Sequence, residues 1–258
     1  MGVQDAAAAV NAKAPLRAFL SRNPYPFPYT VGFFYREKMR AVHRVAPDRD
    51  VADVLEVGGG TSGLTAMLYP RAHITNADLD PACAASPVNR DERVTFVVAD
   101  ATSLPFDDAS FDAVTMFDVI EHVEDDARAI AEAKRVLRPG GFLLVTTPNE
   151  QWRFPYHAAL RPICPSEPEI VERWRHVRRG YALETLARLT GVSAAATATF
   201  IGPVTSIAHD IGFSRLRQSL KRSLCALIAP VTWSGYLLQP RNAQGTETAS
   251  CWLPSPRS

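Results

Sequence analysis

The chain has 258 residues, of which 47% are hydrophobic and 21% are charged, and its formal net charge is +1. This composition is ordinary for a globular protein and excludes collagen-like, coiled-coil and wholly disordered chains. The length predicts one large α/β domain, or one domain with a small appendage. The four cysteines form no Cys-x-x-Cys pair, which argues against a zinc site or a disulfide framework and predicts a cytoplasmic protein.

The sequence contains no targeting or membrane-spanning pattern. No apolar run approaches the roughly 20 residues that cross a bilayer, and the N-terminus lacks the pattern of a secretory signal. The small net charge conceals an asymmetry, because residues 1–150 carry a net charge of −6 and residues 151–258 a net charge of +7. We therefore expect the two parts of the chain to present different surfaces.

Residues 1–50 precede the first predicted strand and are expected to form a cover segment with one helix. The run Asn23–Tyr29 is rich in proline and aromatic residues, which predicts an extended strip whose rings pack on another surface. The residues Val31–Val45 that follow are predicted to form the helix.

Residues 51–148 alternate short apolar runs with helical stretches, a pattern that predicts a parallel sheet wound with helices. A glycine turn at Gly58–Gly63 opens a helix that continues to Tyr69, and Asp125–Leu137 has the spacing of an amphipathic helix. Five strands are expected, at Val51–Val57, Ala72–Ala77, Val94–Val98, Phe111–Phe117 and Phe142–Thr146.

Residues 149–240 are expected to complete the same domain. The prediction here is an irregular loop, then a helix from Ser166 or Pro168 to His176 and a helix at Ala182–Leu189. A sixth strand at Val192–Phe200, a helix at Phe213–Ala229 and a seventh strand at Trp233–Leu238 follow. Residues 241–258 are rich in small and polar side chains and are predicted to be a disordered tail.

The segment Val54–Gly63 carries the first chemical signal. Its strand ends in glycines, and the N-terminus of the following helix favours anionic groups. The spacing Gly58-x-Gly60-x-x-Gly63 alone would equally suit a dinucleotide. Glu56 lies two residues before the first glycine, where its carboxylate would repel a pyrophosphate but attract an ammonium group.

Two further acids follow strands at equal intervals. Asp78 comes 22 residues after Glu56, where a carboxylate can accept hydrogen bonds from both hydroxyls of a ribose. Asp100 comes another 22 residues later and suits a donor such as an exocyclic adenine amine. The three carboxylates would serve an amino-acid end, a ribose and a base, one each. This set matches S-adenosylmethionine better than it matches NAD.

Residues 51–148 resemble a class I S-adenosylmethionine-dependent methyltransferase, of the group that includes ubiquinone-biosynthesis and small-molecule methyltransferases. The resemblance implies a Rossmann-like α/β fold with a seven-stranded, mostly parallel, doubly wound sheet and an antiparallel last strand. One departure is Ser62, which moves the last glycine of the motif to Gly63. The segments that carry the resemblance are Val54–Thr61, Asn76–Pro81, Ala99–Phe106, Ser110–Val114, Val119–Val123 and Leu137–Gly141.

The resemblance also implies which residues bind the cofactor. Asp78 would bind the ribose beside Leu79, and Phe117 would face the sulfonium. Asp100 and Ala101 would hold the adenine edge. Residues 149–240 would form the acceptor side, for a small molecule that is methylated on oxygen, with nitrogen or carbon as alternatives. The methionine end would be lined by Glu56, Gly58, Gly59 and Gly60.

The candidate bases are histidines. His122 follows the fourth strand and is the first candidate for a general base, with His157 and His176 as further candidates and His209 and Tyr181 after them. Glu-His at this position is also compatible with a structural role. Asp118, Glu121 and His122 could instead supply ligands to a divalent ion, but no metal is the favoured prediction, because Asp118 also fits a helix cap.

Other classes of function are weaker hypotheses. A cofactor-binding scaffold without catalysis would not need all three acids. A nucleic-acid methyltransferase is disfavoured, because the arginines of residues 173–179 have the spacing of a solvated helix face. The oligomeric state stays open, with a homodimer among the options.

The basic C-terminal part raises the question of membrane contact. Phe213, Leu216, Leu220, Leu224 and Leu227 recur at helical spacing, with basic residues largely off that stripe, which predicts a helix that packs its apolar stripe on the sheet. The alternative is an amphipathic segment on an anionic membrane. It is disfavoured, because the segment leads into the predicted strand Trp233–Leu238.

Overall fold

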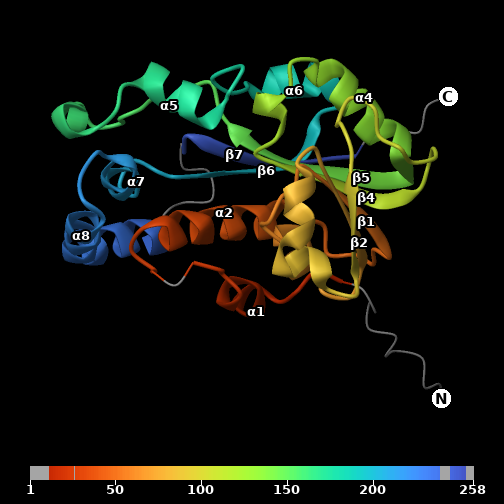
Figure 1. The fold of residues 1–258 in the computed structure, drawn as a ribbon, viewed down its shortest axis with the longest axis horizontal. Helices are drawn as coiled ribbons and strands as arrows, with labels where there is room; N and C mark the ends of the chain where they lie inside the picture. The colour runs from red at the N-terminus through yellow and green to blue at the C-terminus, as the bar shows by residue number, and fades with distance from the viewer. Residues whose placement is uncertain (1–11, 26, 239–244, 254–258) are drawn as a thin grey trace.

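The centre of the protein is a seven-stranded sheet with helices on both faces (Figure 1). The structure is a computed structural model, and it describes residues 12–25, 27–238 and 245–253. The strand order is β3-β2-β1-β4-β5-β7-β6; β1 to β5 are parallel, and β7 runs antiparallel to both β5 and β6. This confirms the predicted fold class. The strands are β1 (Asp53–Val57), β2 (His73–Asp78), β3 (Val94–Val98), β4 (Phe111–Phe117), β5 (Leu137–Pro148), β6 (Ala194–Phe200) and β7 (Glu247–Trp252).

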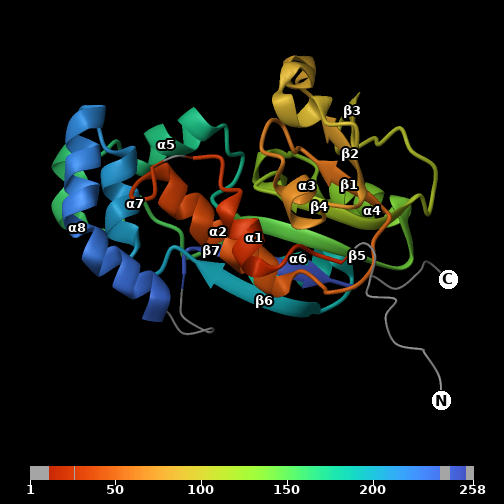
Figure 2. The same cartoon turned by 90° about the horizontal axis from the view of Figure 1, so that it is seen from below.

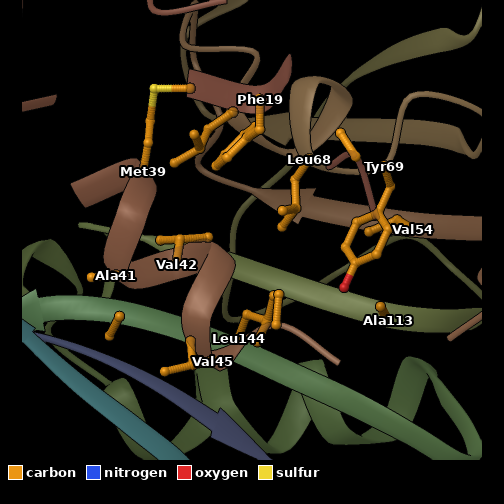
Figure 3. Close-up of a cluster of buried hydrophobic side chains, with 14 of the residues drawn as sticks. Phe19, Met39, Ala41, Val42, Val45, Val54, Leu68, Tyr69, Ala113 and Leu144 are labelled. Atoms are coloured by element: carbon orange, nitrogen blue, oxygen red, sulfur yellow. The ribbon is translucent and has the colours of Figure 1, made fainter. Parts of the chain in front are cut away.

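One face of the sheet is covered by α1 (Leu16–Ser21), α2 (Val31–Val45) and α3 (Leu64–Leu68). Successive side chains of a strand point to opposite faces, so Val54 of β1 joins this core and Leu55 joins the other one. Figure 3 shows the helix side chains packed toward the strands, and the buried partners include Phe19, Met39, Val42, Leu68, Ala113 and Leu144.

The opposite face is covered by α4 (Asp126–Val136) and α6 (Leu183–Thr190). Ile130, Ala133 and Val136 of α4 are fully buried against the strands, as the predicted amphipathic pattern requires. A buried parallel sheet needs apolar side chains on both of its faces, and the apolar runs of residues 51–148 supply them. The short helices Pro81–Ala85, Pro87–Arg90, Ile120–His122 and Ala158–Ile163 lie in the connections.

The seventh strand is not where the sequence places it. Trp233–Leu238 is helical, and the last strand is β7, which lies between β5 and β6. The prediction of a disordered tail is therefore wrong for Glu247–Trp252, all of whose residues are buried. Six described register pairs on each side explain why this segment is ordered. Residues 241–244 and 254–258 of the predicted tail lie outside the described residues.

The C-terminal helices form an end of the molecule far from β1–β4 (Figure 2). In place of the predicted helix Phe213–Ala229 there are α7 (Ser206–Phe213) and α8 (Gln218–Leu238). α5 (Glu167–Trp174) lies nearby and begins with a capping box between Ser166 and Glu169.

The packing of α8 also differs from the expectation. Its buried side chains contact α7 and the start of α2, whereas Leu220 and Leu227 of the predicted buried stripe are 46% and 77% exposed. Among the described residues no helix combines the length and apolar character needed to cross a membrane.

Candidate functional site

The glycine turn after β1 is held in a conformation that other residues rarely adopt. Gly58, Gly60 and Gly63 have φ values of 65°, 52° and 63°. A Cβ at Gly58 would lie 2.5 Å from a methyl group of Val119, and one at Gly63 would lie 2.5 Å from Val88. The turn therefore packs against the loops that follow β2 and β4. Gly63 caps α3 and does not line a described cavity.

A cavity of about 580 Å³ lies at the carboxyl ends of β1 to β4. Ligands of open α/β sheets bind at this edge. Five of the predicted cofactor residues line the cavity: Gly58, Asp78, Leu79, Asp100 and Ala101. His122 lines it as well.

The two acids in this cavity are held by backbone amides. Asp78 accepts hydrogen bonds from the N–H groups of Gly60 and Asp80, both at 2.9 Å. Asp100 accepts bonds from the amide and hydroxyl of Thr102, both at 2.7 Å and both at Oδ1. The Thr102 amide bond lowers the pKa of Asp100, so both the position and the charge suit a hydrogen-bond donor on a ligand.

The remaining predicted cofactor residues do not line this cavity. Gly59 and Gly60 belong to the turn, and a Cβ at Gly59 would collide with Glu56 and Asn76. Glu56 is 2% exposed beneath the turn, where burial raises its pKa. Phe117 packs on the core of α1–α3, and the Lys38 ammonium lies 5.8 Å from its ring.

A second cavity of about 320 Å³ lies between α2, the start of β7 and the segment around α5 and α7. Its walls are aromatic, with Tyr35 from α2 and Trp174 from α5 among them. The polar groups that line it are Lys38, Asp118, Glu121, His176, His209 and Glu247. An apolar cavity with a few convergent polar groups is the usual form of a small-molecule site.

Asp118 lines both cavities. It follows β4 with φ at 55°, a left-handed conformation that Asp tolerates better than most residues. Its carboxylate accepts a hydrogen bond from the Thr146 hydroxyl at 2.6 Å and pairs with the Lys38 ammonium at 2.6 Å. Burial acts to raise the pKa of Asp118, but Lys38 outweighs it and the pKa stays below its usual value.

Glu121, His122 and His176 converge beside Asp118. Their candidate ligand atoms lie within 4.8 Å of one another, and the two imidazole rings are 4.7 Å apart. These three residues could supply ligands to a divalent ion. The cluster differs from the one considered in the sequence, because His176 joins it while Asp118 is already neutralised by a lysine.

Burial controls the charges in the second cavity. Glu121 is 1% exposed, and neither of its oxygens forms a hydrogen bond with another described residue. Burial and the charge of Asp118 raise the pKa of Glu121 to about 8, and burial raises that of Glu247 well above the usual value. The pKa of His176 falls to about 4, because burial and His122 both disfavour its charged form.

The other candidate bases lie elsewhere or serve packing. His157 contacts the Ser206 hydroxyl at 3.1 Å and lines neither cavity. The Tyr181 hydroxyl bonds to the carboxylate of Asp126 at 2.8 Å, also outside both cavities. His209 lines the second cavity, but burial among aromatic rings lowers its pKa to about 3.

Several residues of the second cavity were not found from the sequence. Lys38 and Tyr35 belong to a helix that the sequence predicted only as part of the N-terminal cover segment. Glu247 lies in the segment predicted to be a disordered tail. Trp174 had no pattern that separated it from a core residue. For the described part of the chain, only the tertiary structure brings these residues to Asp118.

Comparison with known proteins agrees with this geometry. Residues 55–145 match the family model described as a methyltransferase domain. A Mycobacterium tuberculosis protein named "Probable S-adenosylmethionine-dependent methyltransferase" is 37% identical over 118 residues, which cover 45% of this chain and 43% of that protein. A demethylmenaquinone methyltransferase of Clavibacter sepedonicus is 37% identical over 142 residues, covering 50% of this chain and 58% of the relative. The chain thus spans about half the length of the curated relatives it matches.

The solved structures show the same fold. An S-adenosylmethionine-dependent methyltransferase from Thermotoga maritima superposes with a TM-score of 0.55 at 20% identity, covering 86% of this chain and 90% of that one. The sheet and the glycine turn are thus found together with a match of residues 55–145 to a methyltransferase domain. The chain resembles the ubiquinone-biosynthesis-like methyltransferases, as the sequence motifs imply.

Proposed function

We propose that the chain transfers a methyl group from S-adenosylmethionine to a hydroxyl oxygen of a small molecule bound in the second cavity. The observation that carries this proposal is the position of Asp118, which lines both the cofactor cavity and the aromatic cavity. A methyl donor in the first cavity and an acceptor in the second would meet at this residue. Holding two reactants in contact is the main way such a displacement is accelerated.

His122 is the proposed general base. Its Nδ1 lies 3.2 Å from the carbonyl oxygen of Arg175, and a proton on Nδ1 donated to this carbonyl leaves the lone pair of Nε2 free. S-adenosylmethionine in the first cavity would supply an electrophilic methyl group. The acceptor oxygen would take this methyl group with S-adenosylhomocysteine as the leaving group, and Nε2 of His122 would accept the hydroxyl proton. His176 packs on the His122 ring and would hold its orientation.

The walls of the second cavity support an acceptor with an apolar body, such as a phenol, a polyketide or a sugar presented by its apolar face. Lysine and carboxylate groups at one end would orient its polar groups. An amine acceptor is the second candidate, because Glu121 and Glu247 bring two further buried carboxylates to this cavity. The four cysteines are unpaired thiols, which supports a cytoplasmic location.

The test uses methyl-labelled S-adenosylmethionine and a panel of phenols, polyols and amines. We expect labelled ethers, and a His122→Ala variant that binds the cofactor normally but has kcat lowered by about 10²–10⁴-fold. His157→Ala is the matched control, because His157 lines neither cavity. Labelled amines among the products would show that the acceptor is an amine and not a hydroxyl. An unchanged kcat in His122→Ala would exclude His122 as the general base.

A further inference from the structure

Helix α8 carries apolar side chains on two opposite sides. Cys225, Ala229, Thr232 and Tyr236 recur every three or four residues and are buried. Leu220, Leu227, Val231 and Leu238 recur at seven, four and seven residues, which places them on one stripe. Their exposed fractions are 46%, 77%, 59% and 79%. Helix α8 itself lies at the outer end of the molecule (Figure 2).

We propose that this stripe, with the aromatic strip beside it, docks on an anionic lipid surface. A row of exposed aliphatic side chains on one helix is a mark of an interaction site, since soluble proteins rarely leave such a row open. The expectation of a helix packed on the sheet rested on a strand at Trp233–Leu238, and that segment is helical. Helix α8 therefore does not lead into a strand at Trp233–Leu238, and its exposed stripe is not needed for packing on the sheet.

The charges around the stripe favour lipid over a protein partner. No acidic residue occurs between Ser214 and Leu238, and Arg217 and Arg222 are exposed at the N-terminal end of α8. In a dimer through this face, these cations would meet either the same cations or the uncharged half of the other helix. An anionic leaflet attracts basic side chains and accepts leucines at the same time.

The aromatic strip connects α8 to the second cavity. The Arg222 guanidinium lies 4.0 Å from the centre of the Phe27 ring, and Tyr25, Phe27 and Tyr29 are each more than 40% exposed. Aromatic rings of this kind favour the headgroup level of a membrane. Tyr25 and Val31 also line the second cavity, so the proposed lipid-facing surface reaches the place where an acceptor would bind.

If the chain has the proposed function, an acceptor that dissolves in lipid would enter the second cavity from the membrane side. This route is the one part of the inference that rests on the proposed function. Docking itself requires no methyl transfer, so it can be tested separately from catalysis.

The experiment measures sedimentation of the purified chain with vesicles at physiological salt. Vesicles of phosphatidylcholine alone are compared with vesicles that also contain phosphatidylglycerol. We expect the chain to pellet with the anionic vesicles only. L227S/V231S should lower the partition coefficient about 100-fold. R217Q/R222Q should lower it about 30-fold, the equivalent of about 1 kcal/mol for each cation.

The matched controls lie on α6, where Leu183 is 38% exposed and Arg188 is exposed. L183S and R188Q should pellet like the unaltered chain. Absence of pelleting, or equal loss in the controls, would overturn the proposal. Equal pelleting with neutral vesicles would show that docking does not require anionic lipid and would overturn that part of the proposal. A dimer in light scattering that L227S/V231S converts to a monomer would assign the stripe to a second copy instead.

Discussion

The ammonium of Lys38 lies 2.6 Å from the carboxylate of Asp118 and joins the cover helix α2 to the end of β4. The lysine side chain is 13% exposed and the aspartate side chain 42%. Asp118 lines both cavities and Lys38 lines the second, so the pair places a positive charge beside a carboxylate where donor and acceptor are proposed to meet.

The first prediction concerns this pair. We expect Lys38→Met and Asp118→Asn each to lower the free energy of unfolding by about 1 kcal/mol. The double variant should lose less than the sum, because the second change removes the charge left unpaired by the first. Urea unfolding measures the coupling. The Arg93–Asp91 pair, at 2.9 Å with its arginine 37% exposed against 13% for Lys38, is the control and should show weaker coupling; equal coupling would contradict the special role of Lys38.

The second prediction concerns the ribose anchor. Asp78→Ala should weaken S-adenosylmethionine binding by about 1–3 kcal/mol, because two ribose hydroxyls would lose their acceptor. Isothermal calorimetry measures this change. Asp108→Ala is the control, since the side chain of Asp108 is 80% exposed and lies outside the cavity lining. Equal affinities in the Asp78 variant and the control would place the ribose elsewhere.

The third prediction concerns β7. Trp252 is 1% exposed and packs in the core of α4 and α6, so Trp252→Ala should lower the free energy of unfolding by about 3–5 kcal/mol. Its neighbour Leu253 is 49% exposed, and Leu253→Ala should change stability by less than about 0.5 kcal/mol. Chemical denaturation compares the two variants. Similar values would mean that the end of β7 does not belong to the folded core.

The fourth prediction concerns pH. Glu37 of α2 is 3% exposed, and burial raises its pKa to about 8. A carboxyl group that holds its proton in the folded state and loses it near pH 4.5 when unfolded destabilises the fold as pH rises between these values. Stability should therefore fall from about pH 5 to pH 8. Glu37→Gln should reduce the slope by up to about 1.4 kcal/mol per pH unit, and an unchanged slope would exclude Glu37 as its source.

The fifth prediction concerns metal ions. Because Lys38 already neutralises Asp118, we expect a chelator to leave methyl transfer unchanged. Turnover with and without EDTA, followed by addition of Mg²⁺ or Mn²⁺, measures this. Loss of activity that a divalent ion restores would assign Glu121, His122 and His176 as its ligands, since their donor atoms already converge.

The lining of the first cavity could be predicted in part from the sequence because its signals are local. Gly58 follows β1 directly, Asp78 is the last residue of β2, and Asp100 comes two residues after β3. Parallel strands end at a common edge, so the pattern of strands alone brings these residues together. The same argument could not locate Lys38, because nothing in a helix sequence states which face of the sheet it will cover.

The parallel sheet, the glycine turn and the amphipathic helix α4 could be predicted from the residues alone, because they depend on periodicity and short spacings. That Glu247–Trp252 is a strand and Trp233–Leu238 a helix depends on contacts between distant parts of the chain. Both segments are short and contain apolar residues, so their own patterns do not separate the two conformations. The backbone partners on β5 and β6 do, since β7 fills the place between them. The same placement brings Glu247 to the second cavity, where Asp118 and Lys38 lie.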